Sequence, residues 1–206
     1  MSLAEKRKAL DLVSPSVHSG VDKKSMDHET ALVEAVIEGS EAAFEELYTF
    51  YYPRLGRFLM RYVNSQSEAE DLIHNVFYQI WKNRERLKRG TTLRAYLFVA
   101  VRNQALKYLG RSQKIIPMER SYEEKEYIEN PESDEHHIEY KEFEQQIKKL
   151  LKQVPEQRRR IFLMHREDEL TYKEIAVVLG ISIKTVETQI SRTLKFLYDQ
   201  VYMRQR

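Results

Sequence analysis

LTYKEIAVVLGISIKTVETQISRTLKFL, residues Leu170–Leu197, is the stretch that decides the fold of this chain. Thr171 and Glu174 have the spacing of a capping box, and the apolar residues after them share one helical face, which predicts a first helix. Gly180 then interrupts the pattern where a tight turn needs a residue that tolerates positive φ. Ser182 can cap a second helix. The apolar residues of this second helix recur at helical spacing and predict its buried side: Val186, Ile190, Leu194 and Leu197.

The outer face of the predicted second helix carries polar and charged side chains that suit a DNA major groove. Arginine and lysine can pair with guanine, glutamate can accept from cytosine, and threonine can contact the thymine methyl group. An ordinary helical hairpin with a solvated polar face is the alternative, since such hairpins are common. The order of cap, helix, glycine turn and second cap favours a DNA-binding helix-turn-helix. Its expected reading face comprises Lys184, Thr185, Glu187, Thr188, Ser191, Arg192 and Lys195.

Composition limits the class of protein. The 206 residues are 42% hydrophobic, which is enough for two small domains with cores of their own. The 34 lysines and arginines nearly balance 32 acidic residues, so the net charge of +2 does not by itself indicate a nucleic-acid ligand. The chain has no cysteine, which excludes disulfides and a thiol nucleophile and suits a reducing cytoplasm. No apolar run reaches the roughly 20 residues of a membrane span, so we expect a cytoplasmic protein without membrane insertion.

Apolar residues recur at intervals of three and four along the rest of the chain, which predicts an all-α fold of two small helical domains. Residues 1–28 show no sustained period and are expected to form a mobile leader. A first domain is expected over residues 29–111. Within it, Ser67 is expected to cap a helix toward Glu70. The outer face of that helix carries Asp71, His74, Asn75 and Gln79.

Basic charge concentrates over residues 82–111, where nine lysines and arginines accompany one acidic residue. A loop followed by a helix over Arg94–Leu109 is predicted there. Tyr96 and Tyr108 interleave with the cations, which suits single-stranded or melted nucleic acid because bases stack on aromatic rings while cations follow the phosphates. A solvated basic helix with core tyrosines fits the composition equally well.

The charge reverses over residues 112–139, where nine acidic residues face three basic ones and Pro117 and Pro131 interrupt the pattern. This composition predicts a flexible acidic linker. A second domain is expected over residues 140–206, with Pro155 at the start of a helix that precedes the helix-turn-helix. Three arginines near that start could reach phosphates or form an ordinary exposed run: Arg158, Arg159 and Arg160.

The sequence offers no convincing catalytic centre. Its six glycines are isolated, so neither a dinucleotide loop nor a phosphate loop is predicted. Asp71 and His74 lie three apart on a helix face and could in principle form an acid–base pair or two metal ligands, but nothing supplies the remaining groups. His165 is expected to be a hydrogen-bonded core histidine. We therefore expect no enzymatic activity, no cofactor and no metal.

The motifs of both modules, taken in order, resemble the bacterial sigma-70 family, specifically the two-domain extracytoplasmic-function (ECF) sigma factors. The resemblance covers about Leu32 to Leu197. In the first domain it rests on GSEAAFEELYTFYYPRL, SEAEDLIHNVFYQIW and LRAYLFVAVRNQALKYL. In the second it rests on VPEQRRRIFLMHREDELTYKEIAVVLGISIKTVETQISRTLKFL. Several ordered motifs across two domains are more specific than a lone helix-turn-helix.

The resemblance implies a dissociable subunit of RNA polymerase that has no catalytic site and directs the enzyme to promoters. Asp71, Asn75 and Gln79 would dock on a coiled coil of the largest polymerase subunit, and the helix-turn-helix would read the minus-35 element of duplex promoter DNA. An anti-sigma factor that wraps or separates the two domains is also implied. Minus-10 recognition and melting would fall to Lys88, Arg89, Thr91, Arg94, Tyr96, Arg102, Asn103 and Lys107.

Two other functions stay open on the residues alone. A stand-alone helix-turn-helix regulator would bind duplex DNA without polymerase, and its N-terminal helices would dimerise or sense a ligand. A protein-interaction module that has lost DNA binding would carry acidic or bulky apolar residues across the reading face, where only Glu187 fits that description.

Overall fold

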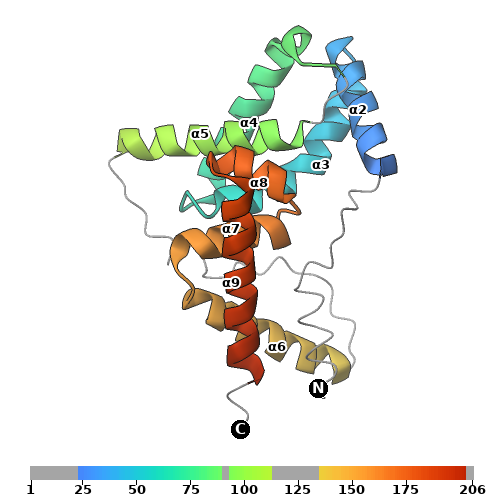
Figure 1. The fold of residues 1–206 in the computed structure, drawn as a ribbon. Coiled ribbons are helices and arrows are strands. Elements are labelled where there is room, and N and C mark those ends of the chain that lie inside the picture. Colours follow the sequence, from blue (N-terminus) through green and yellow to red (C-terminus); the bar gives the residue numbers. More distant parts are fainter. Residues whose placement is uncertain (1–22, 90–92, 113–134, 203–206) are drawn as a thin grey trace.

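The computed structural model describes residues 23–89, 93–112 and 135–202, and within these ranges every regular element is helical (Figure 1). The all-α prediction is therefore confirmed. The elements are α2 (Lys23–Ile37), α3 (Glu41–Leu59), α4 (Gln66–Lys82), the short 3-10 helix η1 (Arg84–Arg86), α5 (Arg94–Ser112), α6 (Glu135–Lys152), α7 (Glu156–Arg166), α8 (Tyr172–Leu179) and α9 (Ile183–Tyr202).

Helices α2 to α5 form the first helical domain, and α3 packs against the other three. Aromatic rings hold these helices together because each ring buries a large apolar area. Phe58 of α3 meets Phe98 of α5 edge to face, with ring centroids 5.1 Å apart, and both rings are fully buried. Nearer the start of α3, Phe44 meets Phe77 of α4 at 5.8 Å. These contacts fix α4 and α5 on two sides of α3.

Two helix starts in this domain differ from the predictions. Helix α2 begins at Lys23, so residues 23–28 of the predicted leader are helical, whereas residues 1–22 lie outside the described part. Helix α4 is capped by Ser65 rather than Ser67, because the Glu68 amide donates to Ser65 Oγ at 3.1 Å. The sequence contains two overlapping cap patterns, and the earlier one is used.

Helices α6 to α9 form the second helical domain. Helix α6 begins at Glu135, five residues before the expected start of this domain, and residues 113–134 of the predicted linker lie outside the described residues. Apolar side chains of α6, α7 and α9 meet in one buried cluster formed by Phe143, Ile147, Leu150, Leu151, Val154, Phe162, Leu163, Leu197 and Val201.

The arginine run at the start of α7 has a structural role within this domain. Arg159 is buried and donates to the carbonyl oxygens of Leu151 and Lys152, at 3.5 and 3.2 Å. These carbonyls belong to the last turn of α6, where a cation satisfies groups that lack helical partners. Arg160 pairs with Glu156 at 2.8 Å. The alternative in which Arg159 reaches a phosphate therefore does not hold in this structure.

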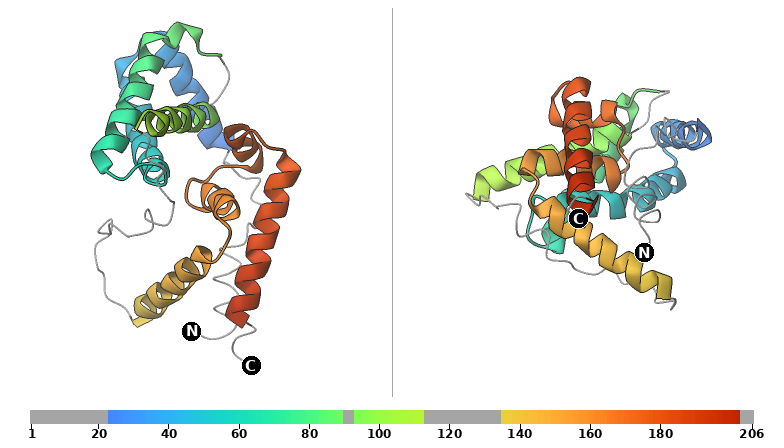
Figure 2. Two further views of the ribbon diagram at one scale, coloured as in Figure 1. Left: turned by 90° about the vertical axis from the view of Figure 1, so that its left-hand side faces the viewer. Right: turned by 60° about the horizontal axis from the view of Figure 1, so that its bottom comes forward.

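A single buried surface joins the two domains. Figure 2 shows α8 beside α5, and the two helices are in contact. The apolar cluster that forms the core of α2 to α5 continues into the second domain through Ile161, Met164, Leu170, Ile175, Ala176, Val178, Val186 and Ile190. The sequence predicted two domains but did not predict that they share a core.

The packing of α5 can be tested with two substitutions on that helix. We expect Phe98→Ala to lower the free energy of unfolding by about 3 to 5 kcal/mol, because it empties a buried ring site. Tyr96 is 52% exposed, so Tyr96→Ala should change the value by no more than about 0.5 kcal/mol. Urea denaturation followed by circular dichroism measures both variants. Equal losses in the free energy of unfolding would contradict a helix α5 that buries Phe98 and exposes Tyr96.

Candidate nucleic-acid interface

Local hydrogen bonds build the helix-turn-helix as the sequence predicts. The Glu174 amide donates to Thr171 Oγ1 at 3.2 Å, and the Thr171 amide donates back to Glu174 Oε2 at 2.8 Å, which completes the capping box of α8. Gly180 ends α8 in the left-handed conformation, with φ 68° and ψ 38°. Ser182 Oγ then accepts from the Thr185 amide at 3.0 Å at the start of α9. Both caps and the glycine turn are confirmed.

Helix α9 separates an apolar side from a polar side. Val186, Ile190 and Leu197 are buried, and Leu194 is half-buried. All seven residues predicted for the reading face lie on the other side of the helix. Lys184, Ser191, Arg192 and Lys195 are exposed, and Thr185, Glu187 and Thr188 are half-buried. The helix therefore presents the expected donors and acceptors together on one surface.

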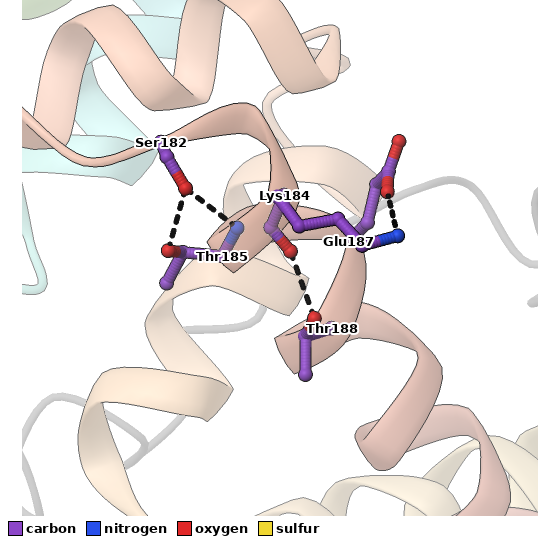
Figure 3. A network of polar contacts seen from close by, with 5 residues as sticks. All are labelled: Ser182, Lys184, Thr185, Glu187 and Thr188. Atoms are coloured by element: carbon purple, nitrogen blue, oxygen red, sulfur yellow. Dashed lines mark hydrogen bonds and ion pairs between the residues drawn. The ribbon is translucent and has the colours of Figure 1, made fainter.

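The polar groups at the start of α9 are paired with one another (Figure 3). Lys184 Nζ lies 3.0 Å from Glu187 Oε2, and the Thr188 hydroxyl donates to the carbonyl oxygen of Lys184 at 2.8 Å. The hydroxyls of Ser182 and Thr185 are 2.8 Å apart. An exposed ion pair of this kind contributes only about 0 to 1 kcal/mol, so it can exchange for base and phosphate contacts at little cost.

The residues predicted for minus-10 recognition differ in their exposure. Lys88, Arg89, Tyr96, Asn103 and Lys107 are exposed, Arg102 is half-buried, and Thr91 lies outside the described residues. Arg89 pairs with Glu38 at 3.3 Å on the surface. The two tyrosines of α5 differ, since Tyr96 is exposed whereas the Tyr108 hydroxyl donates to Glu68. Tyr96 is thus the ring that can stack on an unpaired base.

Arg94 does not face solvent. It is only 8% exposed, and its Nη1 donates to the carbonyl oxygen of Glu169 at 3.2 Å. Glu169 lies in the connection between α7 and α8, so the second domain covers this arginine. The expectation that Arg94 faces DNA does not hold in this conformation. Sequence reasoning missed the contact because the two residues are 75 positions apart.

Glu29 is a positioning residue that sequence reasoning also missed. Its side chain is buried, and Oε1 accepts from the Leu93 amide at 2.8 Å, directly before α5. Leu93 in turn accepts from the Leu97 amide in the first turn of α5. A carboxylate at this place satisfies a terminal amide and is favoured by the helix dipole. Glu29 therefore anchors the start of the helix that carries Tyr96.

The outer face of α4 is the third predicted surface. Asp71, His74, Asn75 and Gln79 are all exposed. Tyr78 of the same helix is 59% exposed. The ring of His74 stacks on Tyr48, with centroids 6.0 Å apart. Opposite this face, α4 buries Leu72, Ile73, Val76, Phe77 and Ile80.

Among the described residues, no group of three His, Cys, Asp or Glu side chains could hold a metal ion. His165 is half-buried and its Nδ1 lies 2.9 Å from the Leu170 carbonyl oxygen, as expected for a hydrogen-bonded core histidine. Over the same described ranges, no helix is long and apolar enough to cross a membrane.

A charged cluster lies where the connection between α7 and α8 meets the first domain. Arg61 and Asp168 form a buried ion pair, with side chains 5% and 0% exposed. Glu167 Oε2 lies 3.3 Å from Arg61 Nη1, and Glu169 Oε2 lies 3.2 Å from Arg54 Nη2. Burial raises the pKa of Asp168 to about 6, although Arg61 favours the charged carboxylate. The cluster joins α3 to the start of the helix-turn-helix.

The geometry described so far defines a two-domain helical DNA-binding protein. Comparison with known families matches the chain to "Sigma-70 region 2" over residues 47–115 and to "Sigma-70, region 4" over residues 144–197. The first match covers most of α3 and all of α4 and α5, and the second covers most of α6 to α9. This chain belongs to the sigma-70 family, within its ECF group, and is a promoter-directing sigma factor of RNA polymerase.

Named relatives span nearly the whole protein at low identity. The chain is 23% identical over 175 residues to the RNA polymerase sigma-H factor of Pseudomonas aeruginosa, covering 82% of this chain and 91% of that protein. It is 24% identical over 178 residues to the ECF sigma factor RpoE of Cereibacter sphaeroides (84% and 94%). It is 24% identical over 177 residues to the sigma-E factor of Escherichia coli K12 (82% and 92%).

Solved structures show the same fold. CnrH in complex with the cytosolic domain of CnrY matches with a TM-score of 0.56 at 18% identity, covering 84% of this chain and 99% of that one. The Bartonella quintana sigma factor RpoE in complex with the anti-sigma factor NepR matches with a TM-score of 0.51 at 19% identity, covering 77% and 96%. These structures confirm the predicted fold, and the family-model matches confirm the predicted family.

The turn of the helix-turn-helix can be tested with two glycine substitutions. Gly180→Ala should lower the free energy of unfolding by about 1 to 2 kcal/mol, since alanine is strained at φ 68°. No atom lies within 4 Å of the added Cβ, so this cost is conformational. Gly56→Ala also meets no atom within 4 Å, but inside α3 it should raise stability by up to about 1 kcal/mol. Urea denaturation measures both variants. A change of the same sign in their free energies of unfolding would contradict the left-handed turn at Gly180.

Proposed function

We propose that this sigma factor reads the minus-35 promoter element with the outer face of α9. Support comes from the seven polar residues gathered on that face: Lys184, Thr185, Glu187, Thr188, Ser191, Arg192 and Lys195. Their chemistry covers guanine, cytosine and thymine edges as well as phosphates. The weak ion pair and hydrogen bonds at the start of the helix leave these groups ready to change partners.

We further assign minus-10 recognition to α5 and the segment before it. Tyr96 is the central residue of this proposal, because an exposed ring flanked by cations can hold an unstacked base. Lys88 and Arg89 are exposed cations before α5, and Lys107 is an exposed cation within α5. Arg102 and Asn103 complete this face, and Thr91 is also proposed to take part in minus-10 recognition. Arg94 can join it only in a conformation in which Glu169 has left.

Docking on core RNA polymerase is assigned to the outer face of α4. Asp71, Asn75 and Gln79 are exposed along one side of this helix, beside the exposed ring of Tyr78. An exposed aromatic side chain such as Tyr78 is typical of a protein interface. The coiled coil of the largest polymerase subunit is the proposed partner.

The remaining parts of the proposal follow from the family. Sigma factors are non-enzymatic initiation factors, so this chain would act without a catalytic site or cofactor and in the cytoplasm with the polymerase. A regulating anti-sigma factor is proposed because a structure of similar fold was solved with one. We expect that partner to engage both domains.

Reconstitution tests the function as a whole. Core RNA polymerase supplied with this chain should yield transcripts that start at defined promoters, and core enzyme alone should not. A footprint on duplex DNA without polymerase, together with no specific transcript, would instead identify a stand-alone helix-turn-helix regulator.

The reading role of α9 predicts a specific loss. Arg192→Ala should weaken promoter binding by the holoenzyme by about 1 to 3 kcal/mol if the guanidinium pairs with a base, and it should relax selectivity at that base. Lys149→Ala removes an exposed cation from α6 and serves as the control. Fluorescence anisotropy with minus-35 variants measures both, and unchanged affinity and base preference would exclude this role for Arg192.

The docking role of α4 predicts a different loss. Asp71→Lys should weaken binding to core polymerase by about tenfold or more, because it places a cation where the interface has an anion. Thermal stability should stay unchanged, since Asp71 is exposed. Glu144→Lys makes the same charge reversal on α6. Equal polymerase affinity of the two variants would remove Asp71 from the interface.

A further inference from the structure

The arrangement of the two domains in this structure is too compact for a promoter. Cα atoms of α5 and α8 approach within 8 Å of each other. Helix α8 is about 12 Å long and the three residues after it span at most about 11 Å, so α9 begins within about 30 Å of α5. Elements centred at minus-35 and minus-10 are about 25 base pairs apart, or about 85 Å of duplex at 3.4 Å per base pair. The domains must separate before both elements can be bound.

The contact between the domains has an unusual charge pattern. Three arginines of the first domain converge on three consecutive residues of the connection between α7 and α8. Arg54 pairs with Glu169, Arg61 pairs with both Glu167 and Asp168, and Arg94 donates to the Glu169 carbonyl oxygen. Carboxylate and carbonyl oxygens accept hydrogen bonds from a guanidinium in the same way as phosphate oxygens do.

Two of the three arginines, Arg54 and Arg61, also contact side chains of the first domain. The Arg54 guanidinium lies over the Phe50 ring at 4.2 Å, and that of Arg61 lies over Phe58 at 5.1 Å. Arg54 also donates to the carbonyl oxygen of Phe50 at 3.0 Å, within α3. These supports do not involve the second domain. Arg54 and Arg61 therefore keep these contacts when the acidic residues depart.

The acidic segment depends more on the contact than the arginines do. Glu169 has a φ of 56°, a left-handed conformation that is unfavourable for a residue with a Cβ. Such strain persists where surrounding contacts fix it. Asp168 is fully buried against Arg61, and separation of the domains would return its carboxylate to water. The segment is thus an anion seated on a preformed cationic surface.

We propose that Arg54, Arg61 and Arg94 form a phosphate-binding surface for promoter DNA, and that residues 167–169 occupy this surface in place of DNA while the chain is closed. This inference rests on the proposed function, because it uses the positions assigned to the minus-10 and minus-35 readers. The acidic segment and the promoter then compete for the same arginines. Closure keeps the polymerase-free chain off DNA, and separation of the domains frees Arg94 for the melting face.

The first experiment removes the charge of the acidic segment in the full-length free chain. We expect Glu167→Gln with Glu169→Gln to tighten binding to a promoter fragment with an unpaired minus-10 region about threefold, since two partly exposed ion pairs are lost. Asp168→Asn should tighten it about tenfold or more, because Arg61 loses its buried partner. Glu144→Gln on α6 removes one exposed ion pair outside the contact and should change nothing.

Domain separation is measured in the same proteins. The sequence contains no cysteine, so dyes can be attached at Ser67→Cys and Gln153→Cys, two exposed positions in different domains. Energy transfer should fall in the variants of residues 167–169 and not in Glu144→Gln. If Asp168→Asn fails to fold, as judged by circular dichroism, the double variant Glu167→Gln with Glu169→Gln provides the test. Unchanged transfer and unchanged DNA affinity in a folded variant would overturn the proposal, as would a fall in transfer without a gain in affinity.

The second experiment tests the arginines in the holoenzyme, where the domains are apart. Arg54→Gln should reduce the slope of log affinity against log salt by about 0.7 to 0.9, which corresponds to one lost phosphate contact. Lys149→Gln is the matched loss of charge on α6 and should retain the wild-type slope. A wild-type slope for Arg54→Gln would overturn the phosphate-binding role.

Failure of the proposed function is distinguishable from failure of this inference. If wild-type chain produced no promoter-specific transcript with core polymerase, the proposed function would fail. Normal transcription together with unaltered DNA affinity in the variants of residues 167–169 would reject only the competition between these residues and DNA.

Discussion

The buried ion pair between Arg61 and Asp168, together with the apolar core that the two domains share, holds the domains in this arrangement. Both side chains are withdrawn from water, and each satisfies a charge that would otherwise be costly in the interior. A buried pair of this kind adds little net stability compared with apolar packing, but it tolerates few alternative geometries. It aligns the connection between α7 and α8 with α3, and this alignment sets α8 against α5 and Glu169 against Arg94.

The two sides of helix α5 have different surroundings: one packs in the core of the first domain, and the other faces solvent. Its inner side is fully buried through Leu97, Phe98 and Val101, and Glu29 binds the amide of the residue before its first turn. These contacts give the helix one fixed position. Its outer side keeps Tyr96 and several polar groups in solvent, and rigid presentation is what a site for an unpaired base requires. The packing that stabilises the first domain thus also positions the proposed melting surface.

The helix-turn-helix depends on local chemistry and little else. Its caps and turn are made by residues within four positions of one another, and the proposed reading groups at the start of α9 make weak exposed contacts. A reader of this kind contributes selectivity at modest affinity. When polymerase and the first domain hold the same promoter, linkage of the sites supplies the remaining binding, since each event raises the effective concentration for the next.

The sequence by itself determined every feature that arises from residues close together in the chain. Helical periodicity, the Thr171–Glu174 box and the turn at Gly180 act over a few residues, so they predicted the all-α fold and the bounds of α8 and the start of α9. The ordered motifs shared with the sigma-70 family also predicted the division into two domains. Where two local patterns overlapped, as at Ser65 and Ser67, only the folded chain showed which one is used.

The tertiary structure alone decided which charged side chains reach solvent. Arg94, Arg102 and Lys107 look alike in the sequence, yet Arg94 is covered by a residue 75 positions away while Lys107 is exposed. Glu29 and Leu93 meet across 64 positions, and Arg61 meets Asp168 across 107. No periodic pattern encodes such pairs. Burial of a long charged side chain depends on partners that only the packing of distant helices brings together.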